Sequence, residues 1–475
     1  MKNKILITAS IPYVNAPPHL GHSLEAIQVD VLARYYRNKV GKENVYLLWG
    51  SDENASKNVE AAQKANTPVK EFVDNHSLDF YKLKEVLNLT FDNFIKTSSD
   101  KHKKGAQKLW KLCSKDIYKK KYKGLYCNGC ENFYKNNEFK NNICPYHKRK
   151  LELFEEENYF FSLSKFQNKL KEIVENNKYL IHPDFRKKEV LNFINRGLED
   201  FSISRPKERT KGWGVSVPNN QDHIMYVWFD ALANYITALG FDKNEKVFID
   251  FWSYSTERIH VVGKDIIKFH AIYWPAMLLS AGINLPTKLL VHGFITISGQ
   301  KMSKTIGNIV DPYEIQAKYG TDPFRYYLLK EIPTIQDGDF SIKRFEELYN
   351  SDLANTLGNL VSRVTNLCEK NNIEIKKTDQ KLNKKVSEYI ENYAFSLALD
   401  EIWKILSKID SDINKNAPWN LEHDKAVIYL IDCISKIRNI AKNLDVFLPN
   451  TSEKILKATQ GKIKKIKPLF PRIYF

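Results

Sequence analysis

Two short basic motifs lie far apart in the sequence, and both carry side chains that bind phosphate. His19 and His22 are three residues apart where a helix is expected to begin, and Gly21 between them has no side chain to block a ligand. Free backbone N–H groups at a helix start also attract anions. Lys301 and Lys304 are likewise three residues apart. Together these groups predict a nucleoside triphosphate site, although histidines in a structural loop and a solvated lysine pair are the alternatives.

Three of the six cysteines cluster with a histidine. Cys127 and Cys130 form one closely spaced pair, and Cys144 and His147 form a second. This spacing is typical of a tetrahedral structural zinc site in a protein from a reducing compartment. We therefore expect one structural Zn²⁺ in a small subdomain, with chance spacing as the alternative.

Alternating apolar runs predict the fold that positions these groups. Residues 4–10 and 45–49 are expected to be buried strands with a helix between them. Strand, loop, helix and strand in this order open a doubly wound, Rossmann-like parallel sheet of the α/β class. Ligands of such sheets bind beyond the carboxyl ends of the strands, where we expect His19, His22 and Asp52 to converge.

The strand pattern is interrupted and then resumes. Strand-like runs return at residues 223–228, 259–262 and 288–292, and beyond residue 345 only helical periodicity persists. We predict a catalytic domain split by an insertion that contains the zinc site, then a loop region and an all-α bundle. The expected ranges are 1–114 and 223–290 for the catalytic halves, 115–222 for the insertion, 291–345 for the loop region and 346–475 for the bundle.

The composition is that of a globular protein with an excess of positive charge. Hydrophobic residues make up 43% of the chain, which argues against disorder. Lys and Arg outnumber Asp and Glu by 73 to 56, so the net charge is +17. This charge favours a nucleic acid partner, with lysine enrichment of the whole proteome as the alternative. Because no apolar run reaches the roughly 18 residues of a membrane span and no signal peptide is evident, we expect a cytoplasmic protein without membrane contact.

The two basic motifs, in this order, resemble those of the class I aminoacyl-tRNA synthetases, which share a His-x-Gly-His motif and a Lys-Met-Ser-Lys-Ser loop. Within this class the chain is most similar to the methionyl-tRNA synthetase family, nearly from end to end. The likeness is also carried by residues 12–15, 50–53, 226–235 and 262–274 and by the two cysteine motifs. There are two departures: Thr305 ends the lysine loop, and Asn54-Ala55 stands where the family often has His-Gly.

The resemblance implies a methionine–tRNA ligase. ATP and L-methionine would give methionyl-adenylate and pyrophosphate, and methionine would then pass to the 3′ adenosine of initiator and elongator tRNA(Met). The implied catalytic residues, which would act beside Mg²⁺ bound with ATP, are His19, His22, Lys301 and Lys304. The implied ATP-binding residues are His19, Gly21, His22, Gly263, Asp265 and Lys304.

The resemblance further implies a pocket for a linear, sulfur-containing side chain. Aromatic residues would exclude branched competitors, the Tyr235 hydroxyl would bond the thioether, and Asp52 would bind the α-ammonium group. Ordinary core packing is the alternative for the aromatic residues. The implied pocket residues are Ile11, Tyr13, Asp52, Trp228, Ala231, Leu232, Tyr235, Ile266, His270 and Trp274.

In the helical tail, four residues match the anticodon-reading positions of the family: Asn359, Arg363, Pro418 and Trp419. An indole stacks on unpaired bases, and amide and guanidinium groups bond base edges. A helix cap and a core tryptophan are the alternatives. Some family members carry an additional dimerising domain after the bundle, and because this chain ends at Phe475 we expect a monomer.

Other readings of the sequence are weaker. The insertion 115–222 is too short for the hydrolytic domain of the branched-chain synthetases, which need one because a methylene is discriminated by only about 1–3 kcal/mol. A cysteine-specific synthetase would use zinc in the substrate pocket, whereas these cysteines lie in the insertion. A non-catalytic tRNA-binding relative is disfavoured because both histidines and both lysines are present.

Overall fold

The computed structural model describes residues 3–127, 132–134, 140–145, 148–301, 309–376, 380 and 382–474. Its contacts divide the chain into two compact units. The first unit comprises Met1–Pro18, Val40–Leu83 and Phe91–Val291, and the second comprises His19–Lys39, Lys84–Thr90 and His292–Phe475. In the ranges that the structure describes, no helix is both long and apolar enough to cross a membrane.

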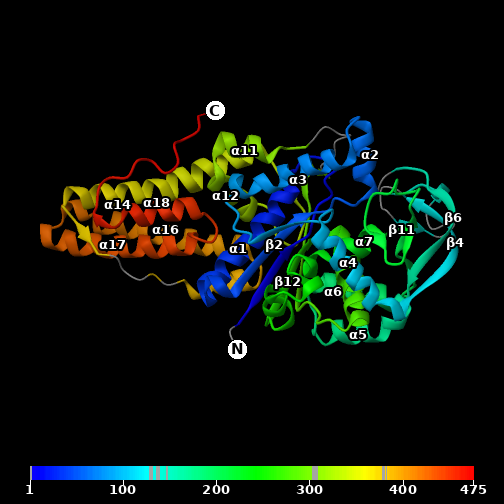
Figure 1. Ribbon diagram of the computed structural model, residues 1–475. Helices are drawn as coiled ribbons and strands as arrows, with labels where there is room; N and C mark the ends of the chain where they lie inside the picture. The colour runs from blue at the N-terminus through cyan, green and yellow to red at the C-terminus, as the bar shows by residue number, and fades with distance from the viewer. Residues whose placement is uncertain are drawn as a thin grey trace. The chain divides into compact units, whose positions relative to one another are not determined.

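A six-stranded sheet forms the centre of the first unit (Figure 1). Its order is β3 (Asn93–Lys96), β2 (Val45–Ser51), β1 (Ile5–Ala9), β12 (Glu257–Gly263), β13 (Lys288–His292) and β7 (Leu180–His182). The pairs of β1 with β2 and with β12 are parallel. The predicted parallel α/β core is therefore confirmed. The strand order reverses between β1 and β12, which is where sheets of this kind bind ligands.

Two strands differ from the predicted organisation. β7 lies within residues 115–222, the predicted insertion, yet it pairs with β13 in the central sheet. Residues 223–228 were expected to return to that sheet, but β11 (Asn220–Met225) pairs antiparallel with β9 (Ser204–Pro206) and β10 (Ser216–Val217). From Val227 the chain is already helical, in α7 (Val227–Leu232). Periodicity could not show this, because a short apolar run fits a strand and a buried helical turn equally well.

Helix α4 (Asp100–Leu112) packs closely against the helices that follow β11. Gly105 allows this approach, because a Cβ there would lie 2.4 Å from the Thr237 side chain at the end of α8 (Asn234–Thr237). One turn later, Trp110 meets Phe229 of α7 edge-on, with ring centroids 5.0 Å apart. These contacts fix α7 and α8, which carry several of the predicted pocket residues.

The segment with the cysteine motifs contributes to an antiparallel sheet in the order β5 (Asn132–Tyr134), β4, β6 and β8 (Phe201–Ser202). Its long strands are β4 (Ile117–Cys127) and β6 (Glu152–Phe161). The lysine run of β4 faces glutamates of β6, with Lys119 3.5 Å from Glu157 and Lys123 3.3 Å from Glu155. The positive charge of this strand is therefore largely matched within the sheet.

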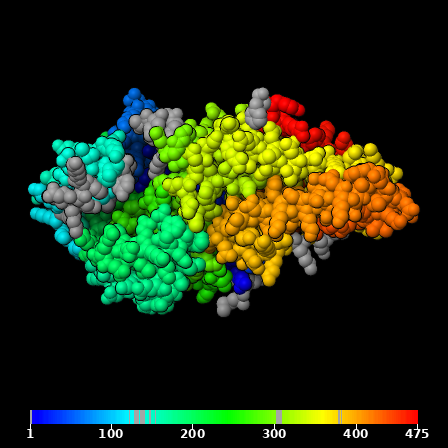
Figure 2. Space-filling view, turned by 180° about the vertical axis from the view of Figure 1, so that it is seen from behind, coloured from blue at the N-terminus to red at the C-terminus, as the bar shows by residue number. Residues whose placement is uncertain are grey.

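The second unit is mainly helical, and the predicted helical C-terminal region is confirmed. Its principal helices are α1 (Leu20–Val40), α12 (Thr321–Lys330), α14 (Asn359–Lys370), α15 (Lys384–Glu391), α16 (Phe395–Asn416), α17 (His423–Leu444) and α18 (Pro449–Ala458). The expectation of an all-α bundle misses one small ladder, β17 (Glu374–Ile375) with β18 (Gly461–Lys462). The last residues run back along the bundle, where Asn350 and Ile473 exchange two hydrogen bonds and the red C-terminal residues lie beside the yellow ones in Figure 2.

A buried guanidinium joins α1 to the bundle. Arg325 of α12 is fully buried, lies 2.8 Å from Asp30 of α1, and donates to the carbonyls of Leu87, Val446 and Phe447. Burial raises the pKa of Asp30, but the guanidinium groups of Arg325 and Arg34 outweigh this effect, so the pKa lies below its ordinary value. Asp30 is therefore ionised, and the pair holds the helix that begins with His19 and His22.

Candidate active site

The carboxyl ends of β1 and β2 bring Asp52 beside the residues that follow β1. The Asp52 N–H donates to the Pro12 carbonyl at 2.8 Å, and Asp52 forms an isolated parallel bridge with Tyr13. Asp52 is only 2% exposed. A carboxylate withdrawn from water in this way pairs strongly with a cation that is desolvated beside it.

Asn54 connects Asp52 with a second carboxylate. The Asn54 N–H donates to Asp52 Oδ1 at 3.1 Å, and its Nδ2 donates to Asp230 Oδ2 at 2.7 Å and to the Thr97 carbonyl at 3.0 Å. Asp230 is fully buried on α7. Sequence reasoning did not select Asp230 as a site residue, although it lies within residues 226–235, one of the stretches that carry the family likeness.

A hydrogen-bonded pair of side chains lies among the predicted pocket residues. The Tyr235 hydroxyl lies 2.7 Å from His270 Nε2, and His270 Nδ1 lies 3.0 Å from the Ile266 carbonyl. Burial lowers the pKa of His270 to about 4, so the ring is neutral at pH 7. Because a carbonyl only accepts, the proton is on Nδ1 and Tyr235 donates to Nε2. In this arrangement Tyr235 does not donate to a thioether as expected, because its proton is engaged by His270.

Behind this pair lies a second buried histidine that sequence reasoning missed. Trp274 donates its indole N–H to His260 Nε2 at 3.2 Å, and His260 Nδ1 lies 2.6 Å from Thr8 Oγ1. Burial holds the pKa of His260 well below its ordinary value. His260 and Thr8 are register partners on β12 and β1, so the sheet itself fixes the indole. A histidine inside an apolar strand was the only available signal.

The remaining predicted pocket residues pack around Trp228. Its ring stacks on Phe269 with centroids 3.7 Å apart, and it meets Tyr13 edge-on at 6.5 Å. Ala231 belongs to the same small cluster, against which Ile11, Tyr13 and Trp228 pack. The adjoining main core contains Leu232, Tyr235 and Trp274, with Ile266 packed against it. All ten predicted pocket residues therefore belong to the first unit, and their apolar members form two adjoining clusters.

The turn after β12 holds the other predicted ATP contacts of this unit. Gly263 ends β12 and is buried, and Asp265 follows in a short helical turn with its side chain exposed. An exposed carboxylate at the carboxyl end of a strand next to β1 is chemically suited to bond ribose hydroxyls.

His19 and His22 lie together at the start of α1 in the second unit. Their rings stack with centroids 3.9 Å apart. The His22 Nδ1 accepts the His19 backbone N–H at 3.2 Å, and the His19 Nδ1 accepts the Gly21 N–H at 3.1 Å. Burial, and then the neighbouring His19, lower the pKa of His22 well below its ordinary value. With both Nδ1 atoms accepting, a neutral ring carries its proton on Nε2, as a donor for an anion.

A tight hairpin leads into the lysine motif. β14 (Ile295–Ile297) pairs antiparallel with β15 (Gln300–Lys301) through Ser298 and Gly299, which have φ of 51° and 72°. Asp339 Oδ1 accepts from the Gly299 N–H at 2.8 Å and from the Thr296 hydroxyl at 2.7 Å. The Gly299 N–H is the main cause of the lowered pKa of Asp339. The prediction for Lys304 lies outside the described residues, as does the side chain of Lys301.

Two of the four predicted zinc ligands are described. Cys127 ends β4, and Cys144 is fully buried in the same small cluster, together with Leu125 and Leu151. The Cys144 N–H donates to the Arg149 carbonyl, and the Cys144 carbonyl accepts from the Lys148 N–H, both at 2.8 Å. The predictions for Cys130 and His147 lie outside the described residues. The two described cysteines thus share one buried cluster, which suits a thiolate-bound metal.

Three of the four predicted anticodon residues, Arg363, Pro418 and Trp419, lie together on the helical unit. The Arg363 guanidinium of α14 lies over the Trp419 ring, 5.1 Å from its centroid. Arg363 is also 3.2 Å from Asp410 and donates to Asn414 Oδ1 at 2.7 Å, both on α16. Trp419, next to Pro418, is 52% exposed, which a core tryptophan would not be. Asn359 begins α14 with its side chain exposed.

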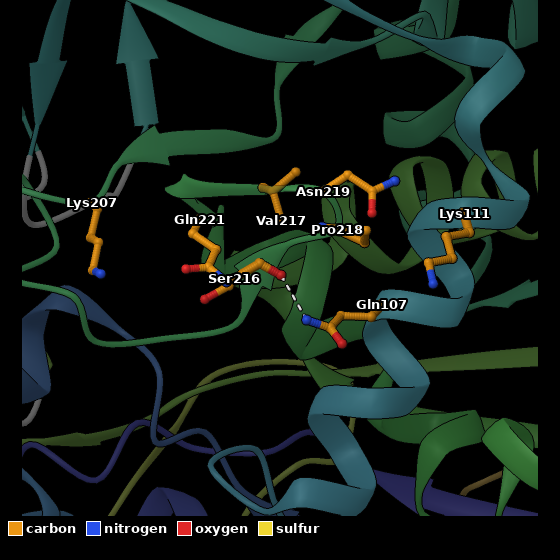
Figure 3. A pocket seen from close by; sticks show the side chains of 8 residues that line it. All are labelled: Gln107, Lys111, Lys207, Ser216, Val217, Pro218, Asn219 and Gln221. Atoms are coloured by element: carbon orange, nitrogen blue, oxygen red, sulfur yellow. Dashed lines mark hydrogen bonds between the residues drawn. The ribbon is translucent and has the colours of Figure 1, made fainter.

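A polar cavity of about 320 Å³ opens elsewhere on the first unit (Figure 3). It lies between α4 and the β10–β11 turn, where Gln107 donates to the Ser216 carbonyl at 3.0 Å. Lys111, Lys207 and the amides of Asn219 and Gln221 also line it. None of the predicted site residues that the structure describes lines this cavity.

Comparison with known proteins gives consistent matches along the chain. The family model of tRNA synthetases class I (M) matches residues 5–152 and 134–365. A methionine–tRNA ligase of Fusobacterium nucleatum is 38% identical over 477 residues, covering 96% of this chain and 74% of that protein. The corresponding enzyme of Brucella suis is 36% identical over 481 residues, covering 96% and 91%.

Solved structures match over almost the whole length. Methionyl-tRNA synthetase of Mycobacterium tuberculosis in complex with methionyl-adenylate superposes with a TM-score of 0.92 at 34% identity, covering 99% of this chain and 100% of that one. Its free form gives a TM-score of 0.84 at 32% identity. Because the identities exceed 30%, the chain is similar to these structures in sequence as well as in fold.

Proposed function

The chain belongs to the methionyl-tRNA synthetase family of class I tRNA synthetases, and on this premise we propose how its residues perform the methionine–tRNA ligase reaction. In this reaction a methionine carboxylate oxygen attacks the α-phosphorus of ATP, and pyrophosphate leaves. The terminal adenosine hydroxyl of tRNA then attacks the acyl carbonyl, and AMP leaves. The observation that carries the assignment of roles is the buried Asp52 beside a cluster of aromatic residues.

In the first step, negative charge grows on the phosphate oxygens. His19 and His22 meet it with Nε2–H groups, and their Nδ1 atoms are held by backbone N–H groups, so the donors are already oriented. Lys301 and Lys304 add positive charge to the β and γ phosphates, and Gly21, Gly263 and Asp265 contact the nucleoside. Mg²⁺ bound with ATP neutralises part of the triphosphate charge.

Methionine is recognised at both ends. Asp52 binds its ammonium group, and the packing around Trp228 and Trp274 accepts a linear side chain while branched ones collide. Because the Tyr235 proton is engaged by His270, the hydroxyl makes no hydrogen bond to sulfur, and the thioether is recognised through contacts of its polarisable sulfur with aromatic rings. Two observations support this proposal: a hydrogen bond to His260 fixes the indole of Trp274, and the ring of Trp228 is stacked on Phe269.

The helical unit binds the anticodon of initiator and elongator tRNA(Met). The half-exposed Trp419 provides a stacking surface, and Arg363 and Asn359 provide donors for base edges. The net charge of +17 supports a polyanionic partner. We also propose that the protein works in the cytoplasm as a monomer.

The cysteine motifs of the first unit would hold one structural zinc ion. Cys127, Cys130, Cys144 and His147 would bind it, and this is supported by the shared buried cluster of Cys127 and Cys144. A structural zinc ion stabilises the segment that binds it and takes no part in the reaction.

Exchange of labelled pyrophosphate into ATP tests the function. Methionine is expected to support exchange, and Asp52→Asn should raise the KM for methionine much more than the KM for ATP. Better exchange with cysteine or leucine would contradict the specificity, and no exchange with any amino acid would favour a non-catalytic tRNA-binding protein. Charging of tRNA(Met) tests the second step.

A further inference from the structure

Asn54 contacts two buried carboxylates that come from distant parts of the sequence. Its backbone N–H donates to Asp52 Oδ1 at 3.1 Å, and its side-chain Nδ2 donates to Asp230 Oδ2 at 2.7 Å. Asn54 is 8% exposed, Asp52 2% and Asp230 0%. Water therefore contributes little here, and these bonds set where each carboxylate points.

The two carboxylates belong to the two ends of the proposed methionine site. Asp52 follows β2 and is the proposed ammonium-binding acid. Asp230 lies on α7 between Trp228 and Ala231, which pack in the side-chain pocket. The Asn54–Asp230 bond is thus a direct link from the ammonium end to the helix that carries the pocket.

An asparagine side chain suits this link because Nδ2 has two hydrogens with separate acceptors. One is directed at Asp230 and the other at the Thr97 carbonyl, 3.0 Å away. A flipped amide would face both acceptors with oxygen, so only one orientation is favourable. A neutral imidazole, the ring that the family often has at this position, has a single N–H and cannot serve both acceptors.

We infer that Asn54 is a positioning residue that sets the spacing between the ammonium-binding Asp52 and the side-chain pocket on α7. This inference rests on the proposed function and adds a determinant of substrate choice to it. A fixed spacing favours an amino acid whose side chain enters the pocket while its ammonium group contacts Asp52. Losing the link lets the two ends shift independently, which weakens methionine binding and lets other apolar amino acids compete better.

Steady-state pyrophosphate exchange with two variants and a matched control tests this role. Asn54→Leu keeps the branched shape and the number of side-chain heavy atoms but removes both side-chain donors, and we expect the KM for methionine to rise about ten- to a hundredfold, the effect of losing a hydrogen bond to a charged group. The KM for ATP should stay within about threefold of wild type, because α7 does not carry the proposed ATP contacts. Asn54→His, which keeps one donor, should recover part of the loss.

The control is Asn44→Leu, since Asn44 is a buried asparagine of the same unit whose Nδ2 bonds the Val40 carbonyl. Asn44→Leu should lose about as much stability as Asn54→Leu but keep the wild-type KM for methionine and for ATP. In Asn54→Leu, the ratio of kcat/KM for methionine over leucine should also fall.

Three results would overturn the inference: an unchanged KM for methionine in folded Asn54→Leu, equal rises in both KM values, or the same methionine effect in Asn44→Leu. If Asn54→Leu does not fold, Asn54→Ala, which also removes both side-chain donors, decides by the same criteria. Absence of methionine-dependent exchange in the wild type would overturn the proposed function together with this inference, whereas a failure confined to the variants would leave that function standing.

Discussion

Replacing Trp419 separates the two proposed activities of the protein. Its ring is 52% exposed and is covered on one side by the Arg363 guanidinium at 5.1 Å. Trp419→Ala therefore removes a cation–π contact of about 0.5–1 kcal/mol and a surface for a base, but it opens no cavity in the core. The fold should survive this change.

The expected effect on tRNA follows from the energy of stacking. A base stacked on an aromatic ring contributes about 1–3 kcal/mol, which corresponds to a loss of about 5- to 150-fold in kcat/KM for tRNA. Pyrophosphate exchange needs no tRNA, so its kinetic constants should stay within about twofold of wild type.

The assay compares aminoacylation of tRNA(Met) with exchange in the same preparations, alongside Leu421→Ala. Leu421 is 38% exposed and two residues away, so it matches the loss of exposed apolar surface without removing a ring. Leu421→Ala should leave both activities unchanged. An equal fall of exchange and aminoacylation in Trp419→Ala, or an equal loss in Leu421→Ala, would refute a stacking role.

Three further predictions concern stability and metal. Burial lowers the pKa of His270 to about 4, so between about pH 6.5 and pH 4 this histidine is protonated in the unfolded state but not in the folded state. The free energy of unfolding therefore decreases as the pH is lowered through this window. Between pH 7 and pH 5, His270 lowers the free energy of unfolding by about 2 kcal/mol. Urea unfolding at both pH values should therefore show a smaller decrease in this free energy for His270→Gln than for wild type. Gly50→Ala should destabilise by about 1–3 kcal/mol in the same measurement, since the new Cβ would lie 2.3 Å from the Ile95 carbonyl oxygen on β3, whereas an unchanged unfolding midpoint would contradict this packing. Metal analysis should find one zinc per chain, lost in Cys144→Ser but kept in Cys113→Ser, and equal zinc content in the two variants would contradict the site.

Much of the architecture follows from local patterns in the sequence. The apolar runs at residues 4–10 and 45–49 predict β1 and β2, because buried parallel strands need continuous apolar side chains. The spacing of Leu24, Ile27 and Val31 predicts α1, and all three are buried. Membership of a sheet is not local, however. The strand that ends at Met225 and the strand β7 reveal their partners only in three dimensions.

The site residues divide in a similar way. Asp52, Trp228 and Tyr235 belong to motifs, and motifs can be read from sequence. Asp230 lies in the same motif as Trp228 and Tyr235, but its hydrogen bond to Asn54, like that of His260 to Thr8, joins residues more than a hundred positions apart, which no spacing rule anticipates. The proton on His270 also required geometry, because the Ile266 carbonyl and the Tyr235 hydroxyl together decide which nitrogen carries it.

The Asp30–Arg325 pair bears on attempts to shorten the protein. Residues 19–39 belong to the same compact unit as residues 292–475, although the chain returns to the sheet in between. Truncation after Val291 would strip Asp30 of its buried partner, a loss of about 3–5 kcal/mol, and would expose the inner face of the helix that begins with the histidine motif. A stable minimal nucleotide-binding fragment therefore cannot be obtained with one stop codon and would need a redesigned surface on α1.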